Sequence, residues 1–377
     1  MTTSPDLDPQ RQEQARQYAR ISRRLMLVEL VLGGLYLFAW LVFGWSAALR
    51  SWLAGFIYSP WLMVPAFAMV FGGLALLLDL PLSYYSGFVL PHRFGQSTQD
   101  LRGWIIDQVK GLLISAVFGL LILEIVYWLL REQPETWWLW LTAFMFLFNV
   151  LIANLAPVLL FPVFYKFSPL DEQHADLAAR LTQLAQSANA AIKGVYQFDM
   201  SSRTKSANAA LVGLGNTRRI LLGDTLLAEF TDDEIETVMA HELGHHVHRD
   251  LPLGILVESG LVLVGFYLAA LVLNGGVELF GFYAPGDIAT LPLLGLVLGL
   301  YGLITMPLSN AWSRWRERLA DRYALECTHN GPAFASAMIR LANQNLADAD
   351  PESWVVLLLY SHPPLRERIE MAADQPW

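Results

Sequence analysis

Six apolar segments, each long enough to cross a bilayer, constrain the fold of this 377-residue sequence more than any other feature. A transmembrane helix needs about 20 consecutive apolar residues. Hydrophobic residues make up 55% of the chain and charged residues only 16%, so its apolar content exceeds that of an average soluble domain. We therefore predict a mainly α-helical, polytopic membrane protein with transmembrane helices at residues 25–45, 61–82, 109–130, 137–160, 251–274 and 288–309.

The distribution of basic residues predicts how the chain is oriented in the membrane. With six spans, both termini share one side of the bilayer with the long polar stretch at 161–250. All but two of the 25 Lys and Arg residues fall on that side, the exceptions being Arg50 and Arg131. Because cytoplasmic loops are enriched in Lys and Arg, we expect both termini and the polar stretch to be cytoplasmic.

The net charge argues against one class of partner, and the cysteine content excludes one class of metal site. The net charge of −9 argues against nucleic acid as a partner, since phosphate binding needs a basic surface. The single cysteine, Cys327, cannot form an internal disulfide or a thiolate metal cluster. The expected surroundings are the lipid bilayer, and any metal site must be built from His, Asp and Glu.

The alternation of apolar and polar stretches predicts three parts. These are a cytoplasmic N-terminal arm at 1–24, a four-span membrane domain at 25–160, and a catalytic domain at 161–377 that is interrupted by the spans at 251–274 and 288–309. Within the polar stretch the spacing predicts one helix, three short strands and a glycine-rich turn, at 171–192, 195–200, 207–212, 219–222 and 213–216. This pattern indicates an α+β domain with a small β-sheet.

An H-E-x-x-H motif, formed by His241, Glu242 and His245, carries the predicted chemistry. Thr231 and Glu234 form a capping box that places the motif on a helix. Residues four apart project from one helical face, so both imidazoles can bind one Zn²⁺ while the intervening glutamate reaches a water molecule as general base. The remaining histidines of this helix are predicted to be surface residues that do not share the metal, namely His246 and His248.

A catalytic zinc usually has three protein ligands, so one more donor is needed. Glu317 and Asp321 lie four residues apart after the sixth span and share a helical face. One of them can bind zinc while the other accepts an imidazole N–H. The spacing fits equally well a surface face in which the two acids pair with Arg314 and Arg318.

The segments 238–250 (VMAHELGHHVHRD) and 313–325 (SRWRERLADRYAL) resemble the zinc endopeptidase family of the type 1 CaaX prenyl protease. The bacterial heat-shock membrane protease HtpX is similar to a lesser degree. The resemblance extends over about residues 80–370 through further blocks at 92–113, 164–170, 206–226 and 361–369. It implies a zincin-type catalytic domain. The eukaryotic prenyl protease has seven spans, one more than this chain, and the difference falls at the N-terminus.

The resemblance also implies a role for individual residues. It implies one Zn²⁺ held by His241, His245 and Glu317, with Glu242 as general base. It implies three further roles: Asp321 as the acid that supports a ligand histidine, His362 as a group near the oxyanion, and Asn208, Ala209 and Arg368 as substrate-binding residues. Apart from the resemblance, Asn208 and His362 are ordinary residues, one at the end of a strand and one before a proline. The implied partner is a peptide or protein substrate, including a membrane-anchored one.

Three glutamates fall inside the predicted spans: Glu29, Glu124 and Glu258. They either line a watered cavity or are protonated and hydrogen-bonded between helices. The main functional hypothesis is a membrane zinc endopeptidase acting on CaaX-type C-termini or on membrane or misfolded proteins. The compact length favours a bacterial inner membrane. The alternatives are a transporter or channel with a structural zinc site, and a catalytically silent scaffold.

Overall fold

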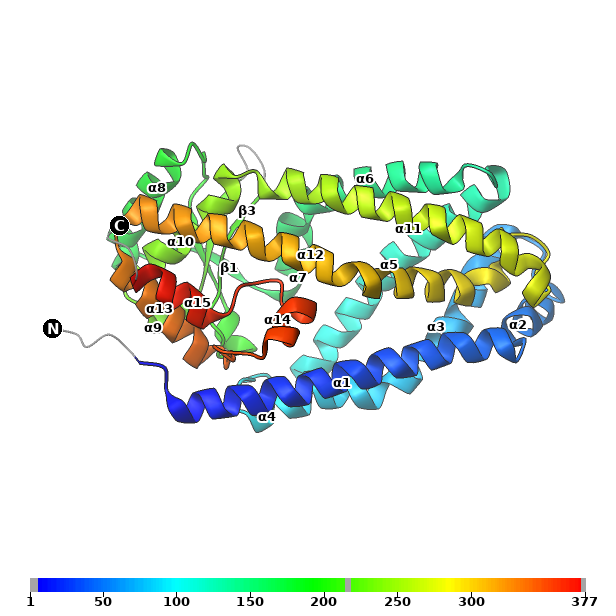
Figure 1. Cartoon of the computed structure of the whole chain (residues 1–377), viewed down its shortest axis with the longest axis horizontal. Coiled ribbons are helices and arrows are strands. Elements are labelled where there is room, and N and C mark those ends of the chain that lie inside the picture. The colour runs from blue at the N-terminus through cyan, green and yellow to red at the C-terminus, as the bar shows by residue number, and fades with distance from the viewer. Residues whose placement is uncertain (1–5, 214–217, 374–377) are drawn as a thin grey trace.

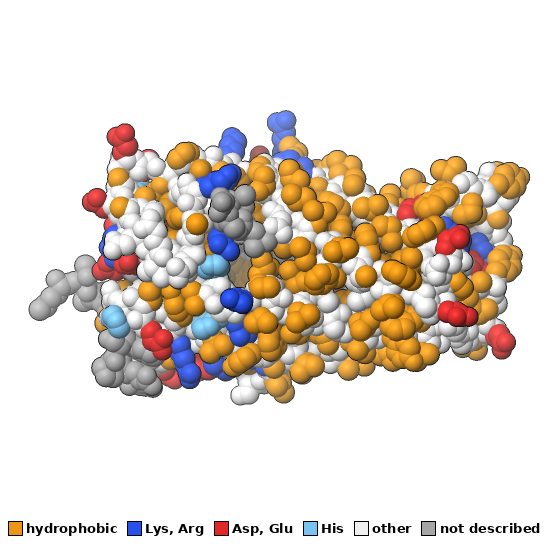
Figure 2. Space-filling model, turned by 90° about the horizontal axis from the view of Figure 1, so that it is seen from above, with side chains coloured by type: hydrophobic (Ala, Val, Ile, Leu, Met, Phe, Trp, Pro, Cys, Tyr) orange, Lys and Arg blue, Asp and Glu red, His pale blue; other side chains and the backbone are white. Residues whose placement is uncertain are grey.

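The computed structural model describes residues 6–213 and 218–373 as an elongated helical molecule, with a small mixed α/β domain at one end (Figure 1). Six helices in the described residues are long and apolar enough to cross a membrane, which confirms the predicted number. They are α1 (Pro9–Val42), α3 (Pro60–Tyr84), α5 (Leu101–Glu132), α6 (Trp137–Leu155), α11 (Asp250–Phe280) and α12 (Leu291–Thr328). Their apolar side chains form a broad belt on the surface (Figure 2).

Helix α1 begins well before its apolar segment, so most of the predicted N-terminal arm is helical. Pro9 opens the helix, and the Asp8 side chain caps it by accepting from two backbone N–H groups. The arm docks on a loop near the C-terminus: the Gln12 side chain donates to the carbonyl of Ala347 (3.2 Å) and accepts from the N–H of Ala349 (3.1 Å). Residues 6–24 of the predicted N-terminal arm are therefore packed against the rest of the fold.

Shorter helices connect the spans and build the α/β domain. The chain is helical at α2 (Trp45–Ala54), α4 (Leu90–Arg93), α7 (Phe161–Phe164), α8 (Ala175–Ser187), α9 (Asp224–Glu229), α10 (Asp232–Val247), α13 (Gly331–Gln344), α14 (Ser353–Leu359) and α15 (Leu365–Ala373). The helix predicted at 171–192 is thus shorter than expected. It ends near Ala188, and Asn189 adopts a positive φ of 53°.

The sheet has four strands in the order β1-β2-β4-β3. The three predicted strands are confirmed as β2 (Val195–Phe198), β3 (Ala209–Val212) and β4 (Arg219–Gly223), while β1 (Phe167–Pro169) was not predicted. β2 and β4 are parallel, and β1 and β3 add antiparallel at the two sides. β3 is therefore an edge strand. Of the predicted turn at 213–216, Gly213 has φ +89°, and residues 214–216 lie outside the described residues.

Two hydrophobic cores hold the molecule together. One lies in the α/β domain, where buried side chains of β4, α8, α10 and α13 belong to one cluster that includes Ile220, Leu222 and Phe334. The other lies at the opposite end of the bundle, around Phe67 and Trp137. Between them the helices bury little of their apolar surface against one another, as expected for helices solvated by lipid.

The glutamates within the spans differ in burial. Glu29 on α1 and Glu258 on α11 are exposed on their helices, whereas Glu124 on α5 is half-buried. One carboxylate oxygen of Glu124, Oε2, has no hydrogen-bond partner among the described residues. Both roles predicted for these acids stay predictions.

Candidate active site

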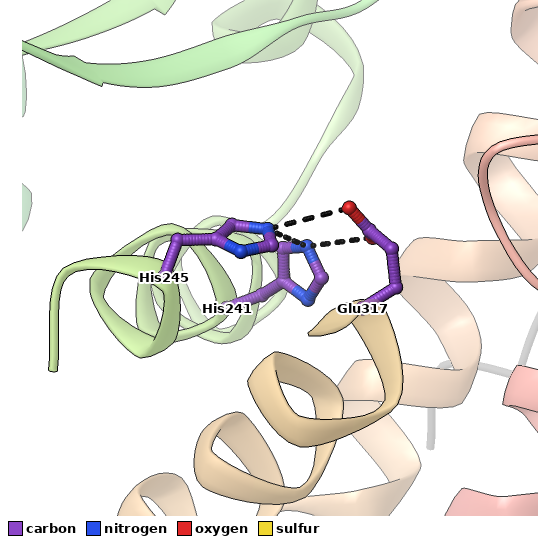
Figure 3. Close-up of side chains that lie close together, drawn as sticks. All are labelled: His241, His245 and Glu317. Carbon is purple, nitrogen blue, oxygen red and sulfur yellow. Dashed lines mark hydrogen bonds and ion pairs between the residues drawn. The ribbon is translucent and has the colours of Figure 1, made fainter. Parts of the chain in front are cut away.

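Helix α10 presents the H-E-x-x-H motif, and its ends are set by local sequence. The Thr231 side chain accepts from the N–H of Glu234 while the Glu234 carboxylate accepts from the N–H of Thr231, which confirms the predicted capping box. The helix ends at His248, and Arg249 adopts a left-handed conformation with φ +56°. This residue turns the chain into α11. His241 and His245 project from the same face of α10 (Figure 3).

A glycine allows α10 to approach α12 closely. A Cβ atom on Gly244 would lie 2.9 Å from the Cα of Ala320, closer than real Cβ contacts. Glycine at this position and alanine opposite let the two helices touch along their backbones. The contact brings Glu317, one turn before Ala320, to the level of the two histidines.

Three side chains that are distant in the sequence converge into a donor cluster. The Nε2 atoms of His241 and His245 lie 3.2 Å apart. Oε2 of Glu317 lies 3.4 Å from Nε2 of His241, and Oε1 of Glu317 lies 3.5 Å from Nε2 of His245 (Figure 3). The ligand atoms all fall within 4.8 Å of one another, a spacing that a single metal ion can bridge.

The protonation pattern of the cluster favours a cation at its centre. Nδ1 of His241 lies 2.7 Å from Oδ1 of Asp321, and Nδ1 of His245 lies 2.7 Å from Oδ2 of Asp250. Since a carboxylate accepts, each ring donates from Nδ1, and a neutral ring then directs an Nε2 lone pair into the cluster. Oε2 of Glu317 is buried without a hydrogen-bond partner among the described residues. Three acceptors facing one another fit a metal cation, and the donor set of two imidazoles and one carboxylate suits zinc.

Each carboxylate behind a histidine is itself paired with a buried arginine. Asp321 accepts from Nε (2.9 Å) and Nη2 (2.5 Å) of Arg368, and Asp250 accepts from Nε of Arg316 (2.7 Å).

Burial alone would lower the pKa of His241, but the Asp321 carboxylate outweighs burial and raises the pKa to about 9. Burial would likewise lower the pKa of Arg368, and Asp321 again reverses the shift and raises it.

The C-terminal segment brings a third histidine to the cluster. Nε2 of His362, between α14 and α15, lies 3.3 Å from Oε1 of Glu317, and 60% of its side chain is exposed. Buried Arg314 anchors the same segment by donating from Nη1 to the carbonyls of Val356 (2.8 Å) and Tyr360 (2.5 Å).

The surface face proposed as an alternative for α12 is not present. Glu317 and Asp321 are both buried in the site rather than solvated. Arg318 instead forms an ion pair with Glu367 (2.8 Å), and the Arg314 guanidinium donates hydrogen bonds to backbone carbonyl groups. The geometry also separates the two acids: Glu317 faces both Nε2 atoms, whereas Asp321 lies behind His241 at Nδ1.

Glu242 lines a cavity of about 340 Å³ beside His245. The cavity extends to Leu211 and Gly213 at the end of β3, so the edge strand and the motif helix border the same space. Asn208 is exposed directly before β3, and Ala209 is buried and pairs with Leu222. Arg368 is only 8% exposed and is engaged by Asp321, so its predicted contact with substrate stays a prediction.

Asp250 and Arg316 were not identified from the sequence. Asp250 stands in the first turn of α11, where an acid is favoured by the helix dipole whatever its other contacts. Its contact with His245 depends on the left-handed turn at Arg249, which no local pattern predicts. His248, in agreement with the prediction, contributes no metal-facing atom. Its carbonyl accepts from Arg316 (2.7 Å), and its ring packs on Tyr323.

Comparison with known sequences identifies the family. The pattern of peptidase family M48 matches residues 171–375, more than half of the chain. This chain belongs to peptidase family M48. Residues 2–166 match the N-terminal region of the CAAX prenyl protease, described as five membrane helices, and within them this structure has four candidate spans. The chain is thus an integral membrane metalloprotease, which implies a metal, typically zinc, and disfavours the transporter and channel hypothesis.

Relatives cover most of the chain. The "Uncharacterized metalloprotease YhfN" of Bacillus subtilis is 31% identical over 96% of this chain and 85% of its own length. The "CAAX prenyl protease 1" of Saccharomyces cerevisiae is 29% identical over 80% of this chain and 70% of its own length. The crystal structure of S. mikatae Ste24p has the same fold, with a TM-score of 0.87 and 24% identity over 99% of this chain and 93% of that one.

Proposed function

We propose that this protein is a zinc endopeptidase that hydrolyses peptide bonds near the cytoplasmic membrane surface. The observation that carries the proposal is the convergence of His241, His245 and Glu317 from two helices that are far apart in the sequence. These residues would hold one Zn²⁺. When bound, zinc lowers the pKa of a water molecule and polarises the scissile carbonyl.

The side chains around the metal ligands supply the rest of the mechanism. Glu242 takes the proton of the attacking water and transfers it to the leaving amine. His362 donates a hydrogen bond to the carbonyl oxygen as negative charge develops on it. Asp321 and Asp250 hold the two ligand imidazoles in the required tautomer, and Arg368 keeps Asp321 in place.

Among the described residues β3 is an edge strand of the sheet, and such an edge supports an extended substrate. A peptide can add to an exposed sheet edge through main-chain hydrogen bonds. Asn208 and Ala209 lie at the start of this edge, and the cavity that reaches the end of β3 also contains Glu242. A strand bound here would present its backbone to the motif helix. Substrate recognition would then depend on backbone contacts and on the side chains that border the cavity.

The comparisons suggest two classes of substrate. The relatives named CAAX prenyl protease 1 point to CaaX-type C-termini, whereas the Bacillus relative named only as a metalloprotease leaves membrane or misfolded proteins open. The positive-inside rule supports cytoplasmic termini. Parallel assays with a prenylated CaaX peptide and with a misfolded membrane protein distinguish the two substrate classes.

Zinc content and peptide cleavage of the purified protein test the proposal. Glu242→Gln should retain zinc, because Glu242 is outside the ligand cluster, and should lose cleavage. Glu326→Gln, an exposed glutamate on α12, is the matched control and should retain both. Cleavage that is equal in the wild type and in Glu242→Gln would refute the mechanism.

A further inference from the structure

The cavity beside Glu242 has a basic wall that the proposed mechanism does not use. Arg218, His246 and Arg249 line it together with Glu242 and His245, and Leu251 contributes an apolar side. Figure 2 shows basic and histidine side chains gathered around a hollow at the border between the apolar belt and the polar domain. The space next to the general base therefore combines cationic and apolar walls, as a site for an amphipathic group does.

The two arginines of this wall differ from the two arginines behind the ligand histidines. Arg316 and Arg368 are buried, and each is neutralised by an aspartate. Arg218 is half-buried and Arg249 exposed, and neither forms an ion pair with a carboxylate in residues 6–213 or 218–373. Among the described residues that line the cavity, Glu242 is the only acid. Two arginines and one glutamate among the lining residues give the cavity wall a net positive charge.

The backbone at Arg249 gives a second indication. Its φ of +56° lies in the left-handed region, which glycine or asparagine occupies with less strain than arginine. The turn needs this conformation to end α10 and bring Asp250 back to His245. An arginine at this position adds nothing to the turn itself. It does place a long cationic side chain at the cavity that holds the general base.

We propose that Arg218 and Arg249 form a subsite for a carboxylate of the peptide substrate, close to the bond that is cut. The inference deepens the proposed function and rests on it. A carboxylate can receive charge-assisted, bidentate hydrogen bonds from a guanidinium. Arg218 and Arg249 form no ion pair with any carboxylate in the described part of the chain, so both guanidinium groups are available. The carboxylate belongs either to an acidic side chain or to the C-terminus of the substrate.

An anionic lipid headgroup is the main competitor for this site, because basic residues also gather at the cytoplasmic border of membrane proteins. The cavity favours the substrate because the same lining includes Glu242 and His245. A group bound there is held next to the reacting peptide. A lipid in the same place would compete with substrate instead of assisting it.

Pairs of peptides that differ by one carboxylate test the subsite. The set consists of a neutral peptide with an amidated C-terminus, the same peptide with a free C-terminal acid, and a series in which one Gln is replaced by Glu at successive positions. For the full-length wild type we expect one carboxylate position to raise kcat/KM about 10- to 100-fold over its neutral partner, the range of a charge-assisted hydrogen bond. The position that responds identifies the source of the carboxylate.

The variants Arg218→Gln and Arg249→Gln should each bring this ratio of kcat/KM values toward one, and Arg249→Lys should keep part of it. Arg322→Gln, an exposed arginine on α12, is the matched control and should keep the wild-type ratio. A ratio near one in the wild type, or a ratio unchanged in both Gln variants, overturns the subsite. The subsite is also overturned if phosphatidylglycerol vesicles inhibit the wild type but not the Gln variants, while the ratio of kcat/KM values is the same in all of them. The two arginines would then bind lipid and not the substrate carboxylate.

Failure of the proposed function gives a different result. In that case the wild type cleaves none of the peptides, or Glu242→Gln cleaves them as well as the wild type does. A protein that cleaves neutral and acidic peptides equally, and loses both activities in Glu242→Gln, keeps the proposed function and loses only the subsite.

Discussion

Replacing Asp321 by asparagine tests how the metal site is supported. The Asp321 side chain is fully buried and accepts three hydrogen bonds, one from Nδ1 of His241 at 2.7 Å and two from Arg368 at 2.9 and 2.5 Å. An asparagine amide has the same shape but only one acceptor oxygen. At the Oδ2 position its NH₂ group would face Nε of Arg368, and at the Oδ1 position it would face both Nδ1 of His241 and Nη2 of Arg368. In either orientation at least one contact becomes donor against donor.

Two separate losses follow from this change. Removing the carboxylate behind a ligand histidine typically weakens metal binding about 10- to 100-fold. Leaving the guanidinium of Arg368 buried without its partner costs about 3–5 kcal/mol of stability, the range for a broken buried ion pair. We therefore expect Asp321→Asn to bind zinc more weakly and to unfold at a lower temperature.

Zinc affinity is measured by competition with a chromophoric chelator, and stability by thermal unfolding in detergent. The titration is run above pH 9, because Asp321→Asn also lowers the His241 pKa from about 9 and so weakens competition by protons at lower pH. Asp250→Asn is the matched control behind His245. The Asp250 side chain is 14% exposed, so water can replace part of the lost contact and the decrease in affinity should be smaller.

The double variant Asp321→Asn, Arg368→Gln separates the two effects. Removing the unpaired charge should recover part of the lost stability without recovering zinc affinity. If folded Asp321→Asn bound zinc within about twofold of the wild type, the proposed support of His241 by Asp321 would be wrong.

Three further predictions concern the surroundings of the site. Arg314→Met removes the hydrogen bonds that anchor the segment carrying His362. The kcat for peptide cleavage should fall about 10- to 100-fold while the zinc content stays unchanged. In a His362→Ala background, Arg314→Met should cause no further loss of kcat. Gly244→Ala places a Cβ 2.9 Å from Ala320 and should cost about 1–3 kcal/mol by thermal unfolding, whereas Gly254→Ala, with nothing within 4 Å, should not lower the melting temperature. Because the His241 pKa is raised to about 9, zinc binding near neutral pH should release about one proton from the His241 ring. The affinity of the protein for zinc should therefore rise with pH until the pH exceeds the His241 pKa. Calorimetry in buffers of different ionisation enthalpy measures the proton, and absence of release would show that the ring is already neutral.

The sequence by itself determined the elements and the motif. Six apolar segments require six helices in a bilayer, because backbone groups in lipid must be paired within the segment. The capping box and the four-residue spacing fixed the helix that carries His241 and His245, since both depend only on residues within one helix. The acids after the last span were found as a pair by the same local periodicity.

The tertiary structure decided how these elements meet. The four-residue spacing could not show whether Glu317 or Asp321 faces the metal, because both acids lie on one face of α12. The position of each acid relative to His241 and His245 is set only by the contact between α12 and α10 at Gly244. The contact of Asp250 with His245 depends on a left-handed turn, and the docking of α1 on the C-terminal loop joins residues more than 300 positions apart. Such contacts arise from packing between elements, whereas a local pattern reports only the face that one element presents.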